Sequence, residues 1–318
     1  MGHIQTVCGP AAAETLGHSQ IHEHIFVRHT PMADKNPALQ LDDFDRSLAE
    51  LKAYRQAGGT FLADAQPVAA GRDALALERL GRESGVIVTA STGYHLLGFY
   101  PETCWVHDLD EEDLYRLYRS ELEEGMLPWD PDPVRRPETV TGVKAGLVKA
   151  AIPAEGATGR YETLLRAAAR AAATCGVPLM LHTEKGEHAP EAVRLCFQMG
   201  VAPEQMVVCH VDRQAVDFAP HEAVARLGVY LDYDTVGRFK YHSDQEEVAL
   251  LRHMSDQGWG DRILLALDTT AQRMASYGGE IGLCYVLDIF LPMLAAAGFS
   301  PEEIQRFTCF NCRHVFEL

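Results

Sequence analysis

The sequence predicts an α/β fold, a (β/α)8 TIM barrel, from eight apolar runs and the helical patterns between most of them. Each run is continuously apolar, which is typical of parallel strands that are buried on both faces. Eight alternations of strand and helix favour a closed barrel over an open doubly wound sheet, and no GxGxxG follows the first run. The predicted strands are 19–27, 60–66, 86–92, 142–151, 177–183, 206–212, 229–235 and 263–269.

Three of the intervening stretches have clear helical signals. Residues 41–59 carry an apolar stripe and stop at the glycine pair Gly58 and Gly59. Residues 161–176 are rich in alanine and also end on a glycine, while 190–200 begin with proline and end with glycine. These stretches are predicted to be helices of the outer layer.

No repeat or linker divides the chain, so we expect one barrel domain spanning residues 1–318. The irregular stretch is 124–140, which contains four prolines. We interpret it as a long loop before the fourth strand, acting as an active-site flap or as an interface element of a homodimer.

Charge and composition exclude several classes of partner. The formal net charge is −17, which disfavours nucleic acid and anionic membrane surfaces. No apolar run reaches the roughly 20 residues of a membrane span, and the first residues lack a signal-peptide pattern. Eight scattered cysteines are typical of reduced thiols, so we expect a cytoplasmic protein. The partner that we expect is a small-molecule substrate.

Potential metal ligands lie in or at the ends of four predicted strands: His22, His24, His182, His210 and Asp268. Residues two apart in a strand point to the same side, so the two histidines of the HxH pair can share one ion. Each signal is weak alone. Their joint placement at the strand ends, where barrel enzymes keep their active sites, predicts a metal site.

The fourth predicted strand contains Lys149 within an apolar run, where burying a free ammonium would be costly. A neutral lysine amine can add carbon dioxide, and the resulting carbamate is an anionic ligand able to bridge two metals. Lys144 lies five residues earlier, and we expect it on the opposite face of the strand, solvated or facing a helix.

The whole set of motifs resembles the phosphotriesterase family of the amidohydrolase superfamily, which includes phosphotriesterase-like lactonases and phosphotriesterase homology proteins. The resemblance covers nearly the whole chain. It rests on LGHSQIHEHIFV, GGTFLADAQPVAAGRD, STGYH, GVKAGLVKAAI, GVPLMLHTEKG, VVCHVDR, LDYDTVG, LLALDTT and TCFNCRHVFEL.

The resemblance implies two divalent metal ions with six protein ligands. His22, His24 and Asp268 would hold a buried ion, His182 and His210 an exposed one, and carboxylated Lys149 would bridge both together with a hydroxide. Zinc is expected because the ligands are mostly imidazole, and manganese or cobalt could substitute. Attack by the hydroxide would make Asp268 the catalytic residue that takes the proton and passes it to the leaving group.

Four further residues are candidates for substrate binding. Tyr94 and His95 follow the third strand and are expected either to orient substrate or to pack. Arg238 and Lys240 follow the seventh strand and are expected either to bind an anionic group or to lie in a solvated loop. YDTVGRFKY resembles the sugar-lactone and homology-protein branches, but Ala271 stands where a phosphate-binding arginine would follow the strand-eight aspartate, so a phosphate on the substrate stays open.

The first functional hypothesis is a lactonase or related carboxylic ester hydrolase. The second is an amide or phosphoester hydrolase, including a phosphotriesterase, at the same site. A TatD-like nuclease shares several ligands, but it has Glu in place of Lys149, and the net charge of −17 gives DNA little attraction. A non-enzymatic binding protein would need neither a bridging ligand nor an open metal face.

Overall fold

A computed structural model describes residues 2–318 of the chain and contains the predicted barrel. Eight parallel strands form one sheet in the order β10-β9-β8-β7-β6-β5-β4-β3. The backbone N–H of Asp268, after the last strand, donates to the carbonyl of His22 in the first strand (3.0 Å), which links the two edges. The strands are β3 (His18–Glu23), β4 (Gly59–Asp64), β5 (Ile87–Gly93), β6 (Leu147–Ala151), β7 (Leu179–His182), β8 (Met206–Cys209), β9 (Tyr230–Tyr233) and β10 (Ile263–Leu265).

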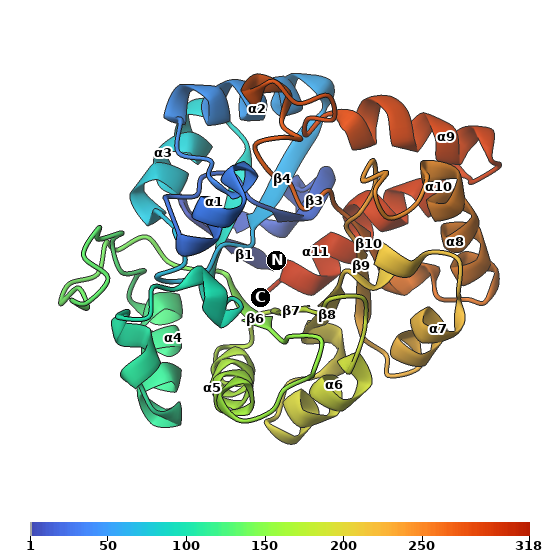
Figure 1. Cartoon of the computed structure of the whole chain (residues 1–318). Coiled ribbons are helices and arrows are strands. Elements are labelled where there is room, and N and C mark those ends of the chain that lie inside the picture. The colour runs from blue at the N-terminus through green and yellow to red at the C-terminus, as the bar shows by residue number, and fades with distance from the viewer. Residues whose placement is uncertain (1) are drawn as a thin grey trace.

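Helices surround this sheet (Figure 1). The three helices predicted from sequence correspond to α2 (Phe44–Ala57), α5 (Arg160–Cys175) and α6 (Ala189–Gln198). The helix α2 begins after the N-cap Asp43 and ends at Gly58, whose φ of 109° a glycine adopts without strain. The helices are α1 (Pro31–Lys35), α2 (Phe44–Ala57), α3 (Ala74–Ser84), α4 (Glu111–Glu123), α5 (Arg160–Cys175), α6 (Ala189–Gln198), α7 (Ala219–Ala225), α8 (Asp244–Asp256), α9 (Leu291–Ala296), α10 (Pro301–Gln305) and α11 (Asn311–Phe316).

An antiparallel hairpin that the sequence did not predict, β1 (His3–Thr6) and β2 (Gly9–Ala12), precedes the barrel. Ile4 of this hairpin is fully buried in the same apolar cluster as Leu147 and Leu264. Leu147 is the first residue of β6, and Leu264 is the second residue of β10. The hairpin therefore packs at the end of the barrel where the strands begin, opposite the end that carries the predicted ligands.

The alternation of side chains in β6 decides where Lys149 points. Val148 and Ala150 pack in the cluster between the sheet and the helices, whereas Leu147 packs inside the barrel. Lys149 lies on the same face as Leu147, so its side chain points into the barrel. The predicted fourth strand was too long at its start: β6 begins at Leu147, and Lys144 is a half-buried residue before the strand rather than a residue on its opposite face.

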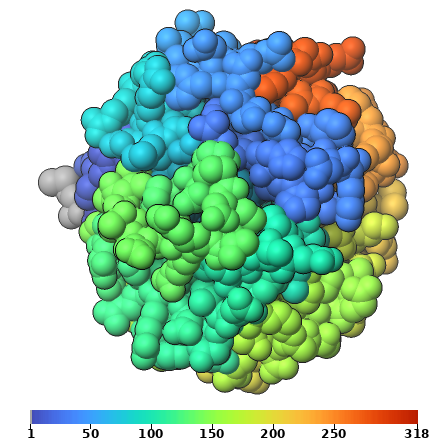
Figure 2. Space-filling view, turned by 60° about the vertical axis from the view of Figure 1, so that its left-hand side comes forward, coloured from blue at the N-terminus to red at the C-terminus, as the bar shows by residue number. Residues whose placement is uncertain are grey.

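The proline-rich stretch 124–140 contains no helix or strand, as predicted. It lies on the surface, shown in green in Figure 2, next to α4 and to the segment that contains Thr30 and Pro31. Its Trp129 stands against the guanidinium of Arg28 (4.9 Å to the ring centre) and lines a cavity of about 470 Å³ together with Trp105 and Arg72. Within residues 2–318, no helix is both long enough and apolar enough to cross a membrane.

Candidate metal centre

All six predicted metal ligands meet at the C-terminal end of the barrel. Nζ of Lys149 lies 2.9 Å from Nε2 of His22, and Nε2 of His210 lies 2.8 Å from Nδ1 of His182. Nε2 of His24 lies 3.5 Å from Oδ1 of Asp268. The rings of His22 and His210 have centres only 4.8 Å apart, so the two groups of ligands are adjacent.

Two of these residues have an uncommon backbone conformation. His210 follows β8 directly with a φ of 67°, and Asp268 lies three residues after β10 with a φ of 49°. Such left-handed conformations are rare outside glycine and cost free energy, so the surrounding structure must impose them. They turn each side chain back over the mouth of the barrel.

A buried glutamate imposes the conformation around Asp268. Oε1 of Glu23 accepts a hydrogen bond from the backbone N–H of Leu267 (2.9 Å). Its Oε2 accepts from both the backbone N–H (3.2 Å) and the hydroxyl (2.8 Å) of Thr269. Burial raises the pKa of Glu23 to about 8, although these hydrogen bonds lower it. The central residue of the HxH motif thus fixes both neighbours of Asp268.

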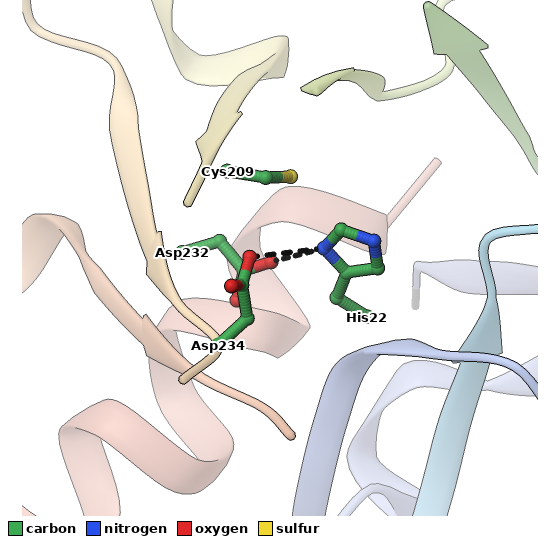
Figure 3. Close-up of side chains that lie close together, drawn as sticks. All are labelled: His22, Cys209, Asp232 and Asp234. Atoms are coloured by element: carbon green, nitrogen blue, oxygen red, sulfur yellow. Dashed lines mark hydrogen bonds and ion pairs between the residues drawn. The ribbon is translucent and has the colours of Figure 1, made fainter. Parts of the chain in front are cut away.

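A second buried carboxylate, that of Asp234, orients His22 and His210, and Figure 3 shows its contact with His22. Oδ1 of Asp234 lies 2.6 Å from Nδ1 of His210, and its Oδ2 lies 3.1 Å from Nδ1 of His22. Oδ2 of Asp232 also lies 3.1 Å from that Nδ1. Because an ionised carboxylate only accepts, each Nδ1 carries the proton and each Nε2 keeps a lone pair facing the centre.

Three of the imidazoles, those of His22, His182 and His210, are uncharged at neutral pH. Burial lowers the pKa of His22 to about 3, and Lys149 lowers it further. Burial likewise lowers the pKa of His210 to about 4 and that of His182 well below its usual value. Neutral imidazole is the form that binds metal ions.

Lys149 has no counter-ion. Its side chain is fully buried, and Nζ contacts Nε2 of His22 and, at 3.5 Å, Sδ of Met180. Within the described chain no carboxylate forms an ion pair with it. Nδ1 of His24 is also buried without a hydrogen-bond partner. Four imidazoles, a carboxylate and an unpaired amine form a nitrogen and oxygen donor set that suits a transition-metal ion.

A pocket of about 570 Å³ opens above this centre. His24, His182 and Asp268 lie at its base. Its walls contain four cationic side chains, from Arg213, Arg238, Lys240 and Arg273. The four cationic side chains outnumber the two acidic ones that line the pocket, Glu184 and Asp268, in a chain whose net charge is −17.

The predicted substrate contacts do not all reach this pocket. His95 lines it and stacks on Phe99, with ring centres 3.7 Å apart. Tyr94 is 1% exposed, packs in the core and is not part of the pocket wall. Lys240 is exposed at the rim. Arg238 lines the pocket but its guanidinium pairs with Oδ2 of Asp268 (3.1 Å) and donates to the carbonyl of the same residue.

The sequence did not lead us to select Arg213 or Arg273 as pocket residues, although Arg273 is the arginine nearest to Ala271. Nη2 of Arg213 lies 3.5 Å from Oδ2 of Asp268, and its Nη1 lies 3.3 Å from Oε2 of Glu184. Arg273 donates to the carbonyl of Val236 (2.7 Å). Arg213 follows His210 by three residues in VVCHVDR, and this position beside a strand end was the available signal.

Comparisons with known proteins place the chain in a family. The model of the phosphotriesterase family matches residues 2–316. The chain is 28% identical to a phospho-furanose lactonase of Mycoplasmopsis synoviae (strain 53), over 94% of this chain and 87% of the relative. It is 25% identical to an N-acetyltaurine hydrolase of Danio rerio, over 96% and 95% of the two chains. The crystal structure of an amidohydrolase from Mycoplasma synoviae superposes with a TM-score of 0.90 at 27% identity, covering 100% of this chain and 92% of that one.

Proposed function

This chain belongs to the phosphotriesterase family and is a metal-dependent hydrolase, and we propose that it hydrolyses a lactone bearing an anionic group at a centre for two zinc ions. One observation carries the proposal. The buried, unpaired amine of Lys149 lies beside His22, one of the ligands assigned to the buried ion. A carboxylated lysine there would supply the negative charge and the bridging oxygen atoms that two cations need.

The six ligands divide between the two ions as follows. His22, His24 and Asp268 would hold the buried ion, His182 and His210 the exposed one, and carboxylated Lys149 both. When bound, such a pair of ions acidifies a shared water molecule and polarises a carbonyl oxygen. Manganese or cobalt would fit the same donor set.

The side chains of the protein perform the proton transfer and the positioning. Asp268 lies at the base of the pocket, where its carboxylate can take the proton of the attacking water and give it to the alkoxide released by ring opening. Arg238 and Arg213 contact its Oδ2 and hold the carboxylate in place. His95, stacked on Phe99, presents its ring at the same base.

The cationic wall favours an anionic substrate. Lys240 is exposed at the rim and its Nζ lies 4.6 Å from the ring centre of Tyr241, with no carboxylate partner among the described residues. It is free to meet a phosphate or carboxylate of the substrate. An apolar phosphotriester would gain nothing from this charge. The similarity to a phospho-furanose lactonase supports the same substrate class.

A substrate comparison tests the proposal. The zinc-loaded enzyme is assayed with an anionic lactone, its uncharged counterpart, an N-acyl amide carrying an acidic group, and a phosphotriester. We expect kcat/KM to be highest for the anionic lactone. If the amide or the phosphotriester is cleaved at least as efficiently as every lactone, the reaction class is wrong, whereas a preference for the uncharged lactone would reject only the anionic group.

A further inference from the structure

A second group of buried acceptors lies outside the metal centre. Asp212 follows β8, and Thr235 follows β9. His242 lies just before Ser243, the N-cap of α8, and Glu247 lies in the first turn of that helix. The side chains of Asp212, Thr235 and Glu247 are fully buried, and His242 is 8% exposed. These residues belong to neither the six ligands nor the wall of the substrate pocket.

The hydrogen bonds in this group use every available donor. The backbone N–H and the hydroxyl of Thr235 both donate to Oδ2 of Asp212 (2.7 Å each). Because the hydroxyl has one proton, its lone pairs face Nε2 of His242 at 2.7 Å. Nδ1 of His242 donates to the carbonyl of Ser243 (3.0 Å). In the neutral ring Nε2 therefore also has a lone pair, and it faces Oε2 of Glu247 at 3.2 Å.

Three carboxylate oxygens of this group lack a hydrogen-bond donor. Oδ1 of Asp212 and both oxygens of Glu247 are buried without a hydrogen-bond partner. Within residues 2–318, no lysine or arginine forms an ion pair with either carboxylate. The neighbouring Arg213 turns toward the pocket, where it meets Glu184 and Asp268.

Other acids lie near Glu247. Burial raises the pKa of Glu247 well above its usual value, and the charges of Asp212, Asp234 and Asp244 raise it further. Two buried carboxylates that face a lone pair and each other need a cation or an additional proton between them.

We propose that Asp212, His242 and Glu247 bind a divalent metal ion, with zinc as the best match. One ligand atom from each residue lies within 4.8 Å of the other two. One imidazole and two carboxylates suit zinc. The hydrogen bond from Nδ1 to the Ser243 carbonyl is the arrangement that orients a ligating histidine through its Nε2.

This ion has a structural role. It joins the end of β8 to the start of α8, and Thr235 connects both to the segment after β9. That segment continues through Arg238 and Lys240 at the pocket rim. The bound ion fixes the rim from behind without touching the substrate.

Diffraction tests the proposal directly. Crystals of the full chain grown with zinc are measured on both sides of the zinc absorption edge. We expect an anomalous difference peak between Asp212, His242 and Glu247, separate from those at the main centre. Density at the main centre with none at this cluster would overturn the proposal and assign the cluster an extra proton, on His242 or a carboxylate.

A matched pair of variants gives a second test in solution. Glu247→Gln keeps the shape of the side chain but removes a charged ligand, while Asp256→Asn changes an exposed acid on the same helix. Metal analysis should show one equivalent less zinc in Glu247→Gln than in wild type, whatever number the main centre holds, and no loss in Asp256→Asn. Equal zinc in wild type and Glu247→Gln would overturn the proposal. If Glu247→Gln does not fold, the diffraction result decides.

Discussion

Glu23 holds Thr269 by two hydrogen bonds to a single oxygen, one from the backbone N–H and one from the hydroxyl. These bonds connect β3 to the segment after β10, across the point where the sheet closes. Glu23 contacts Leu267 and Thr269, and the residue between these two is Asp268, whose φ is 49°. The position of the proposed catalytic carboxylate thus depends on a side chain that cannot itself reach the substrate.

Replacing Glu23 with glutamine should lower kcat and zinc affinity, each by roughly 10- to 100-fold, as is usual for residues that position metal ligands. A glutamine amide has one oxygen and one NH2 group. The NH2 group would face the backbone N–H of either Leu267 or Thr269, so one of these hydrogen bonds is lost. Steady-state kinetics and zinc titration measure the effect. Glu187→Gln, an exposed glutamate, serves as control. Unchanged kinetics in Glu23→Gln would show that Asp268 is positioned in another way.

Asp234→Asn should weaken zinc binding by roughly 10- to 100-fold. One carboxylate accepts from Nδ1 of both His22 and His210, and an asparagine side chain has a single oxygen for the two donors. Competition with a chelator measures the affinity, with the exposed Asp288→Asn as the matched control. Equal affinity in Asp234→Asn and wild type would mean that the two rings are oriented by packing alone.

Lys149→Ala should lose zinc and reduce kcat/KM by roughly 100-fold or more, because the bridging ligand is removed. Short carboxylic acids added with bicarbonate should partly restore both. Lys144→Ala is the control, since Lys144 lies before β6 and outside the barrel interior. If Lys149→Ala keeps both metal and activity, a carboxylated lysine has no part in the site.

Lys240→Ala should raise KM for an anionic lactone by about 10-fold while kcat changes less, because an exposed rim cation contributes to binding more than to the transition state. The KM for an uncharged lactone should stay within about 2-fold of wild type. Lys185→Ala removes another exposed lysine and should have no effect. An equal rise in KM for both lactones would argue against an ionic contact.

His221 should make stability depend on pH. Burial lowers its pKa from 6.5 to about 4, and its ring accepts from the Tyr233 hydroxyl (3.0 Å) while donating to the Gln214 carbonyl (3.1 Å). The unfolded state binds a proton at His221 more readily than the folded state does. The contribution of neutral His221 to the free energy of unfolding is therefore present above pH 6.5 and is lost as the pH falls toward 4.

Denaturant titration at pH 7.5 and 5.5 measures this dependence. Between these two conditions wild type should lose about 1 kcal/mol more of its free energy of unfolding than His221→Gln. Identical losses in the two proteins would contradict the assignment to His221.

The barrel was predictable because its strands are buried on both faces and therefore read as uninterrupted apolar runs. The β1–β2 hairpin was not, since GPAA has neither the apolar run nor the β-branched residues of a strand. Lys144 was misplaced because the apolar run 142–151 extends beyond the hydrogen-bonded strand, which begins at Leu147.

The ligands could be predicted as residue types at strand ends, but their supporting contacts could not. Glu23 and Asp234 read as ordinary acids, and only the closure of the sheet brings Glu23 to Thr269 and Asp234 to His22. Tyr94 and His95 follow the same strand end, and the sequence does not say which one faces the pocket. The structure turns His95 inward and Tyr94 into the core.

The left-handed backbone conformation at Asp268 makes folding and catalysis favour different residues at this position. Most side chains with a Cβ are disfavoured at a φ of 49°, whereas glycine, asparagine and aspartate tolerate it. Glycine or asparagine would thus preserve folding there while abolishing the carboxylate, and a glutamate would keep the charge but strain the chain. Few substitutions at this position would therefore be neutral for both folding and catalysis. A lineage that relaxed the demand for catalysis would be expected to pass first through asparagine or glycine, leaving an intact but inactive barrel.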